Sequence, residues 1–204
     1  MSGLFRATAP LVLASGSPRR RDFLADLGLA FVVQKAEIDE AARPGEEPSA
    51  FVARLAREKA EYVAGRHPAP WILAADTVVV VEQRILGKPG DGDEALEMLR
   101  LLSGRWHEVW TGFRIMQGQS GLGASREVCT RVRFMDLSPA LCAAYLRTGE
   151  PFDKAGGYGI QGKGAFLVAE IKGSYTNVVG LPIAELLAEL LRLRIIAPAG
   201  KPAV

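Results

Sequence analysis

An acidic residue stands inside the most apolar segment of this sequence. Asp76 interrupts the run Trp71–Val81, whose other members are aliphatic or aromatic except for Thr77. A carboxylate in a buried strand carries a large desolvation cost unless a cation or a hydrogen-bond donor faces it. Asp76 is therefore a candidate general base or metal ligand, and a purely structural ion pair is the alternative interpretation.

The segment Ser15-Gly16-Ser17-Pro18-Arg19-Arg20 has a composition suited to anion binding. Its small residues let a ligand approach the backbone. A helix that begins after Ser17 would direct its first N–H groups and its positive dipole end toward that ligand. The two arginines add guanidinium groups that match phosphate oxygens. A phosphate site and an ordinary capped helix with solvated arginines are both consistent with this segment.

Polar residues elsewhere could complete such a site. Glu37, Asp39 and Glu40 form an acidic cluster in a polar loop, which suits a hard cation or plain solvation. Lys59 and Lys88 are basic residues of a kind that ordinarily lies on the surface. The chain has only two Cys and two His, which excludes a cysteine-based zinc site. A metal would have to be held by carboxylates and phosphate, which favours Mg²⁺ or Mn²⁺.

A glycine-rich segment between Asp153 and Gly162 carries one amide side chain, that of Gln161. Such a segment can mould itself around a planar ligand, or it is a plain flexible connection. Its glycines match the pattern G-x-G-x-x-G. A dinucleotide site also needs a strand before that pattern and a helix after it, and the sequence predicts neither. A dinucleotide-binding fold is therefore rejected.

The elements that must position these residues alternate between strands and helices. Apolar and alternating patterns predict strands at 11–14, 31–33, 71–81, 107–116, 127–135 and 165–171. Capping residues and apolar stripes predict helices at 17–27, 49–64, 91–103, 138–149 and 182–194. This order predicts an α/β fold in which a mixed, twisted sheet is flanked by helices. We expect residues 1–10 to form an N-terminal arm, 11–194 a single domain with a central cleft, and 195–204 a frayed tail.

Composition limits the function classes. The 204 residues are 49% hydrophobic and 24% charged, which is typical of a globular protein and excludes a disordered one. Lys and Arg total 25 against 23 Asp and Glu, and no long basic run predicts a duplex-binding face. The apolar segments are too short to cross a bilayer. We therefore expect a soluble cytoplasmic protein with no membrane and no nucleic-acid partner.

Taken in order, these segments resemble the Maf family of nucleoside triphosphate pyrophosphatases, a family related in fold to the inosine triphosphate pyrophosphatases. The resemblance covers nearly everything from Leu11 to Leu191. Its blocks are 13–20, 74–77 with 87–89, 153–162 with 177–182 and, more weakly, 57–60. The chain departs from the family pattern at Lys35-Ala36-Glu37 and after Leu193.

The resemblance implies hydrolysis of a nucleoside triphosphate to the monophosphate and pyrophosphate with a divalent metal, Mg²⁺ or Mn²⁺. Within the family, the chain is similar to the branch that acts on dTTP and UTP. The resemblance also implies a role in clearing modified nucleotides. A homodimer is a further expectation from the family. The roles implied are catalysis for Asp76, substrate choice for Arg19, Thr77 and Gln161, phosphate binding for Ser15, Arg20, Lys59 and Lys88, and metal binding for Glu40 and Asp76.

Three alternatives remain open at this point. One is the branch of the same family that hydrolyses 7-methyl-GTP, although that branch carries an acid in the loop where this chain has Gln161. Another is a nucleotide-binding regulator of cell division. The third is a nucleic-acid-binding module that uses the cluster Arg19–Arg21, and the acid at Asp76 argues against a protein that only binds.

Overall fold

The computed structural model describes residues 3–200. It divides into two compact units, and each is described by itself. The first unit comprises the chain up to Asp76, the segment Gly112–Glu127 and the chain from Gly180 onward. The second comprises Thr77–Thr111 and Val128–Val179. Among the described residues, no helix is both long and apolar enough to cross a membrane.

The strands form a mixed sheet, as the sequence predicts. Its order is β3-β2-β4-β6-β7-β8, with β5 paired to β4 outside that path. β2 is parallel to β3 and β4, whereas the pairs β4–β5 and β7–β8 are antiparallel. The strands are β1 (Phe5–Ala7), β2 (Leu11–Leu13), β3 (Val32–Val33), β4 (Trp71–Val81), β5 (Arg84–Leu86), β6 (Trp106–Gln117), β7 (Gly123–Phe134), β8 (Val168–Lys172) and β9 (Ile196–Pro198).

Helices accompany both units, which confirms the predicted α/β class. The α-helices are α1 (Pro18–Asp26), α2 (Pro48–Ala64), α3 (Gly92–Leu102), α4 (Pro139–Leu146), α5 (Tyr175–Val179) and α6 (Ile183–Arg192). Three short 3-10 helices are η1 (Glu150–Asp153), η2 (Ala155–Gly157) and η3 (Gly162–Leu167). The strand β5 and the helix α5 are additions that the sequence pattern does not predict.

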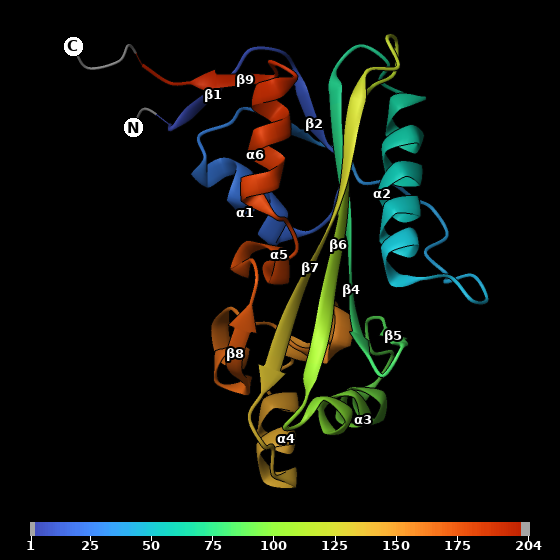
Figure 1. Cartoon of the computed structure of the whole chain (residues 1–204), viewed down its shortest axis with the longest axis vertical. Helices are drawn as coiled ribbons and strands as arrows, with labels where there is room; N and C mark the ends of the chain where they lie inside the picture. Colours follow the sequence, from blue (N-terminus) through green and yellow to red (C-terminus); the bar gives the residue numbers. More distant parts are fainter. Residues whose placement is uncertain (1–2, 201–204) are drawn as a thin grey trace. The chain divides into compact units, whose positions relative to one another are not determined.

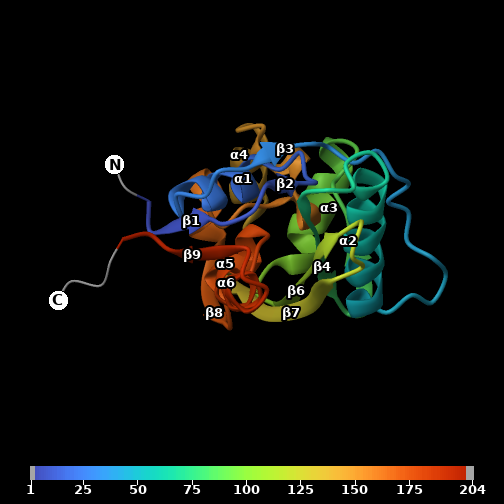
Figure 2. The ribbon, with the colours of Figure 1, turned by 90° about the horizontal axis from the view of Figure 1, so that it is seen from above.

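In the first unit, the alternation of side chains along β2 and β4 divides the core into two faces. Leu13 and Leu73 pack in the cluster that contains residues of α1 and α6. Ala14 and Ala74 pack in the cluster that contains residues of α2. Figures 1 and 2 show α1 and α6 on one side of these strands and α2 on the other. Asp76 has the same parity as Ala74, so its side chain faces α2.

A glycine allows α2 to lie close to the sheet. A Cβ atom on Gly112 of β6 would stand 2.7 Å from the carbonyl carbon of Val52, a backbone atom of α2. Backbone atoms cannot move aside as the end of a flexible side chain can, so any larger residue at this position would push the helix away from the strands. This close approach sets how near the side chains of α2 come to β4.

The second unit has its own core, built from α3, α4 and the far halves of the long strands. The N-terminal caps of both helices are confirmed. Asp91 accepts a hydrogen bond from the backbone N–H of Glu94 at 2.9 Å, and Ser138 accepts one from that of Leu141 at 3.3 Å. The expected strand at 165–171 begins later, at Val168, because the preceding residues form the helix η3.

The expectation of a frayed tail is wrong for the residues up to 200. Ile196–Pro198 forms strand β9, which pairs antiparallel with β1 in the N-terminal arm, and Phe5 lies opposite Pro198. Ile196 is buried in the apolar cluster of the first unit. An aliphatic side chain that finds a core outweighs the tendency of a chain end to fray. Residues 201–204 of the expected tail lie outside the described residues.

A buried histidine belongs to the core of the second unit. His107 is 2% exposed, and its Nε2 lies 2.8 Å from the hydroxyl of Tyr158 in a hydrogen bond. Its ring stands edge to face against Phe134, with 4.9 Å between the ring centroids. Burial lowers the pKa of His107 to about 4, so the ring is neutral at pH 7.

We expect His107 to make the fold sensitive to acid. Its pKa is near 6.5 when unfolded and about 4 when folded, so between these values the unfolded chain binds more protons and stability falls as the pH falls. The contribution is about 3 kcal/mol between pH 7 and pH 4. Urea unfolding at a series of pH values should show a flatter profile for His107→Gln than for the parent. Parallel profiles would contradict a neutral buried ring.

Candidate active site

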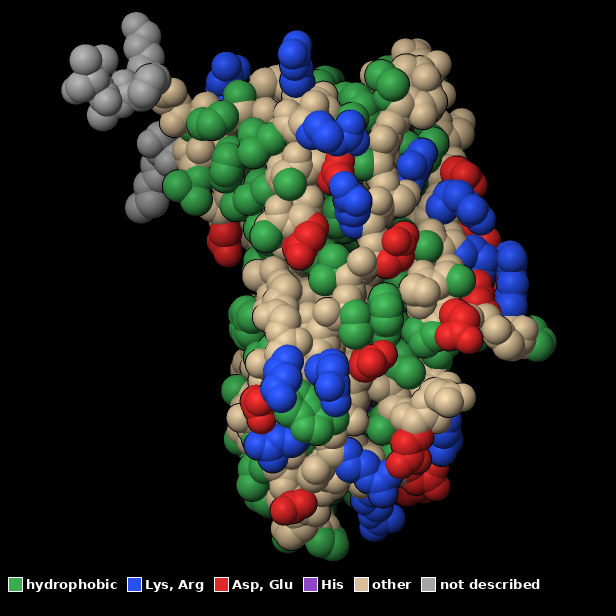
Figure 3. All heavy atoms as spheres, viewed as in Figure 1, with side chains coloured by type: hydrophobic (Ala, Val, Ile, Leu, Met, Phe, Trp, Pro, Cys, Tyr) green, Lys and Arg blue, Asp and Glu red, His purple; other side chains and the backbone are tan. Residues whose placement is uncertain are grey.

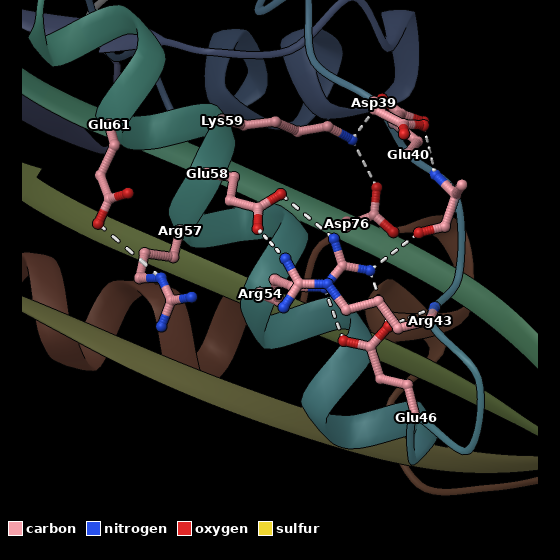
Figure 4. Close-up of polar contacts among 11 residues, drawn as sticks. Asp39, Glu40, Arg43, Glu46, Arg54, Arg57, Glu58, Lys59, Glu61 and Asp76 are labelled. Atoms are coloured by element: carbon pink, nitrogen blue, oxygen red, sulfur yellow. Dashed lines mark hydrogen bonds and ion pairs between the residues drawn. The ribbon is translucent and has the colours of Figure 1, made fainter.

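A buried lysine meets the acid in the apolar strand. The ammonium of Lys59, on α2, donates a hydrogen bond to Asp76 Oδ1 at 2.6 Å and lies 2.8 Å from Glu40 Oε1 (Figure 4). Lys59 and Asp76 are each 8% exposed, whereas the side chain of Glu40 is 52% exposed. The desolvation cost of Asp76 is thus met by a cation, as its position in the sequence requires.

The helical repeat explains why Lys59 points inward. It follows Val52 and Ala56 at spacings of seven and three residues, so it lies on the buried stripe of α2. Its aliphatic stem can therefore lie among apolar side chains while the ammonium reaches the carboxylates. The reading of Lys59 as an ordinary exposed lysine is wrong, and its place on the stripe was the signal for burial.

Two acidic residues of the loop make different contacts. Glu40 is the member that contacts Lys59. Asp39 Oδ1 instead accepts a hydrogen bond from the backbone N–H of Ala41 at 2.9 Å, which shapes the turn. Residues 3–200 contain no group of three or more His, Cys, Asp or Glu side chains placed to hold a metal ion. Glu40 and Asp76 share one cation, and that cation is an ammonium group.

Arg20 turns into the fold from the first helix. It is 8% exposed and donates hydrogen bonds to the backbone carbonyls of Gly180 and Ala75, both at 2.7 Å. It also donates to Ser15 Oγ at 3.2 Å. Burial lowers its pKa, and the nearby carboxylates of Asp76 and Glu40 oppose that effect. Arg20 therefore ties the small-residue loop to the residue of β4 directly before Asp76.

The inward turn of Arg20 bears on the nucleic-acid alternative. Arg21 makes an exposed ion pair with Asp22 at 3.1 Å, so the arginine cluster does not act as a single basic surface. On the face shown in Figure 3, acidic side chains are interspersed among the basic ones. Both observations weigh against a duplex-binding module, which needs several cations on one face.

The start of α1 has the character of an anion site. Ser17 occupies the N-cap position, as predicted, but its hydroxyl makes no capping hydrogen bond. Its backbone N–H instead donates to Ser15 Oγ at 3.2 Å. A Cβ atom on Gly16 would lie 3.5 Å from the side chain of Lys35, so this lysine of the divergent Lys35-Ala36-Glu37 segment covers the loop. Small residues and nearby basic side chains suit phosphate.

Arg19 lies in α1 of the first unit, whereas the second unit holds Thr77, Lys88 and Gln161. Thr77 Oγ1 is hydrogen-bonded to Thr111 Oγ1 at 2.9 Å. Lys88 is exposed in the turn after β5. The carbonyl of Gly87 accepts a hydrogen bond from the backbone N–H of Gly156 at 2.9 Å, so the structure joins the Lys88 turn to the glycine-rich segment.

The glycine-rich segment is not a plain flexible connection. The Glu150 carboxylate accepts hydrogen bonds from the backbone N–H groups of Lys163 and Gly164, at 3.0 and 3.1 Å. It also accepts one from the hydroxyl of Tyr145 at 3.1 Å. That hydroxyl in turn accepts from a backbone N–H on the other side of Gln161. Gln161 is thus exposed at the tip of a loop whose two limbs are tied together.

Known proteins are similar to this chain over most of its length. A family model described as Maf-like protein matches residues 10–193. A dTTP/UTP pyrophosphatase of Desulfotalea psychrophila is 48% identical over 194 residues, which is 95% of this chain and 100% of the relative. A dTTP/UTP pyrophosphatase of Myxococcus xanthus is 53% identical over 185 residues, covering 89% of this chain and 91% of the relative.

A solved structure, that of the Ham1 protein of Staphylococcus aureus, is also similar to this chain. The alignment covers 62% of this chain and 72% of the other, with a TM-score of 0.43 and 15% sequence identity.

Proposed function

Since the chain belongs to the family of Maf-like proteins, we propose that it hydrolyses dTTP and UTP to the nucleoside monophosphate and pyrophosphate. The observation that carries this proposal is the buried contact of Lys59 with Asp76, in a chain about half identical to dTTP/UTP pyrophosphatases over most of its length. The Maf resemblance predicted from the sequence blocks is confirmed by the family match.

The proposed reaction is an attack by water on the α-phosphorus. A bond forms between the water oxygen and phosphorus, the α–β anhydride bond breaks, and pyrophosphate leaves with the electron pair. Asp76 accepts the proton that the water loses. Lys59 holds this carboxylate in one orientation, and a carboxylate has acceptor sites beyond the one that the ammonium uses.

The developing charge of the leaving group needs fixed positive charge. We assign this task to Arg20, Lys59 and Lys88, with Ser15 as a hydroxyl donor in the small-residue loop. Arg20 contributes its charge and also holds the loop, because its donors are engaged with Ser15 and with backbone carbonyls. The start of α1 adds backbone N–H groups.

Glu40 and Asp76 fit a divalent cation. Mg²⁺ is usually bound by one or two carboxylates together with substrate phosphates, and these two carboxylates already share the Lys59 ammonium. When bound, Mg²⁺ or Mn²⁺ would neutralise phosphate oxygens and activate water. We therefore assign Glu40 and Asp76 as its protein ligands.

We assign recognition of the nucleobase to Gln161, Thr77 and Arg19. Gln161, at the tip of the tied loop, offers an amide to the edge of uracil or thymine, and Thr77 and Arg19 assist in the choice. An amide at this point favours a pyrimidine with two carbonyls over 7-methyl-GTP. The regulator of cell division remains an alternative for which the described residues offer no particular support.

The test is a nucleotide panel with detection of both pyrophosphate and orthophosphate. With Mg²⁺ or Mn²⁺ present, dTTP and UTP should each yield one pyrophosphate per monophosphate. Release of orthophosphate in place of pyrophosphate, or no turnover of any triphosphate with either metal, would refute the proposal.

Two further proposals concern the cellular location and the oligomeric state of the protein. Both cysteines are free, as is usual in a reducing compartment, and nucleoside triphosphates are cytoplasmic molecules, so we propose a cytoplasmic enzyme. The homodimer expected from the family stays a prediction, which sedimentation of the purified protein would measure.

A further inference from the structure

A second charged side chain of α2 is buried, and the mechanism above does not use it. Arg54 is 7% exposed. Its Nε and Nη2 donate to the two carboxylate oxygens of Glu46 at 2.6 and 2.7 Å, and its Nη1 donates to Glu58 at 3.2 Å (Figure 4). The guanidinium of Arg54 therefore faces the loop between Glu40 and Glu46 and not the solvent.

The fork of Arg54 also reaches the backbone beside Glu40. Its Nη2 donates to the carbonyl oxygen of Ala41 at 3.0 Å. The N–H of the same residue donates to Asp39 Oδ1 at 2.9 Å. The residue that follows Glu40 is therefore held through both its carbonyl and its amide. Glu46, at the other end of this loop, is held by the same guanidinium.

The direction of the Glu40 carboxylate depends on the loop that carries it. Its side chain is 52% exposed, so packing alone cannot fix its direction. The loop from Glu40 to Glu46 contacts α2 along its length. Lys59 meets the side chain of Glu40, Arg54 meets the Ala41 carbonyl and the Glu46 carboxylate, and Glu58 pairs with Arg43. Anchoring the backbone reduces the number of positions that the carboxylate can take.

A stabilising role is a weak explanation for Arg54. Burying a guanidinium carries a desolvation cost that often equals what its ion pairs return, and an apolar residue of similar size would serve stability as well. What an apolar residue cannot do is bind Glu46 in two places and the Ala41 carbonyl in a third. This geometry therefore favours a role in positioning the loop over a role in stability.

We propose that Arg54 is a positioning residue that holds Glu40 against Lys59 and Asp76, so that Glu40 and Asp76 can share one divalent cation. The inference deepens the proposed function and rests on its metal assignment. Groups that orient a metal ligand usually contribute 10- to 100-fold to metal affinity. We expect about the lower of these values, because substrate phosphates would supply other ligands of the cation.

The test compares three variants by their affinity for Mn²⁺, measured by electron paramagnetic resonance with a non-hydrolysable dTTP analogue bound. Arg54→Lys keeps the positive charge but loses the several donors of the guanidinium. Glu46→Gln weakens the hydrogen bonds to that guanidinium without changing the size of the side chain at position 46. Arg57→Ala is the matched control, since Arg57 pairs only loosely with Glu61, at 3.8 Å, on the exposed side of the same helix (Figure 4).

We expect Arg54→Lys to weaken Mn²⁺ binding about 10-fold, Glu46→Gln to weaken it in the same direction, and Arg57→Ala to match the parent. The Mg²⁺ activation curve of Arg54→Lys should shift likewise, with kcat at saturating Mg²⁺ close to that of the parent. If Arg54→Lys does not fold, judged by circular dichroism, Glu46→Gln decides the matter.

A double variant shows whether Arg54 acts through Glu40. On a Glu40→Gln background, Arg54→Lys should add no further loss of Mn²⁺ affinity, because the ligand that it positions is gone. An additive loss, or parental Mn²⁺ affinity in folded Arg54→Lys and Glu46→Gln, would overturn the inference. Such a result would leave the proposed function standing if the parent still forms pyrophosphate from dTTP. Absence of that activity in the parent would instead overturn the proposed function.

Discussion

Asp76→Asn should lower kcat for dTTP by about 10²- to 10⁴-fold while the protein still folds. Asparagine keeps the size and shape of the side chain, but it cannot accept a proton from water at neutral pH and is a poorer metal ligand. Lys59 would keep Glu40 as its anionic partner, so its ammonium would not be left alone in the core. The expected loss is therefore one of chemistry more than of stability.

Steady-state kinetics with pyrophosphate detection measure this loss, and thermal unfolding of the variant measures stability. Asp22→Asn is a suitable control, because Asp22 is an exposed aspartate of α1 whose partner is the neighbouring Arg21. It should behave as the parent does. A kcat near the parental value in Asp76→Asn would show that the buried ion pair is structural, which is the alternative that the sequence left open.

The second large effect concerns recognition of the nucleobase. The parent should prefer dTTP and UTP over CTP, GTP and 7-methyl-GTP, and Gln161→Glu should change that ranking. The edge of uracil or thymine presents carbonyl acceptors and one N3–H donor, and a glutamine amide offers both an acceptor and donors. Guanine presents two adjacent donors, which a carboxylate matches better. An unpaired polar group costs about 1–3 kcal/mol, which corresponds to roughly 5- to 150-fold in kcat/KM.

Cytosine is the demanding comparison, since its amino group replaces a carbonyl and rotation of the Gln161 amide could partly restore the hydrogen bonds. Discrimination against CTP should then depend also on Arg19 and on Thr77, whose hydroxyl is held by Thr111. Lys163→Ala is the control: it alters an exposed neighbour and keeps the backbone N–H that Glu150 binds. If the parent prefers a guanosine substrate, or if Gln161→Glu leaves the ranking as it was, Gln161 does not read the base.

The elements that could be predicted from the sequence are those that depend on neighbouring residues. The strand Trp71–Val81 was predicted to the residue because its β-branched, apolar composition allows little else. The caps at Asp91 and Ser138 were predicted because a capping side chain acts within three residues. Asp76 stood out for the same local reason, as a charge among apolar neighbours.

The features that could not be predicted depend on partners far along the chain. The carboxylate partners of Lys59 and Arg54 are of this kind, because only the folded loop brings Glu40 and Glu46 to α2. Arg20 finds the carbonyl of Gly180, from the other end of the sequence. The loop around Gln161 owes its form to Glu150, which no local turn pattern indicates.

The pairing of β1 with β9 bears on the order in which the chain can fold during its synthesis. The first unit is assembled from the beginning, the middle and the end of the sequence, whereas every residue of the second unit lies between Thr77 and Val179. All residues of the second unit are therefore synthesised before those of α6 and β9. The first unit cannot be completed until the residues from Gly180 onward have been synthesised. The same holds for the hydrogen bond from Arg20 to Gly180, which helps to hold the small-residue loop beside Asp76. Long-range contacts of this kind form slowly. A chain that stalls before Gly180 should thus lack the hydrogen bond to Arg20 and be inactive.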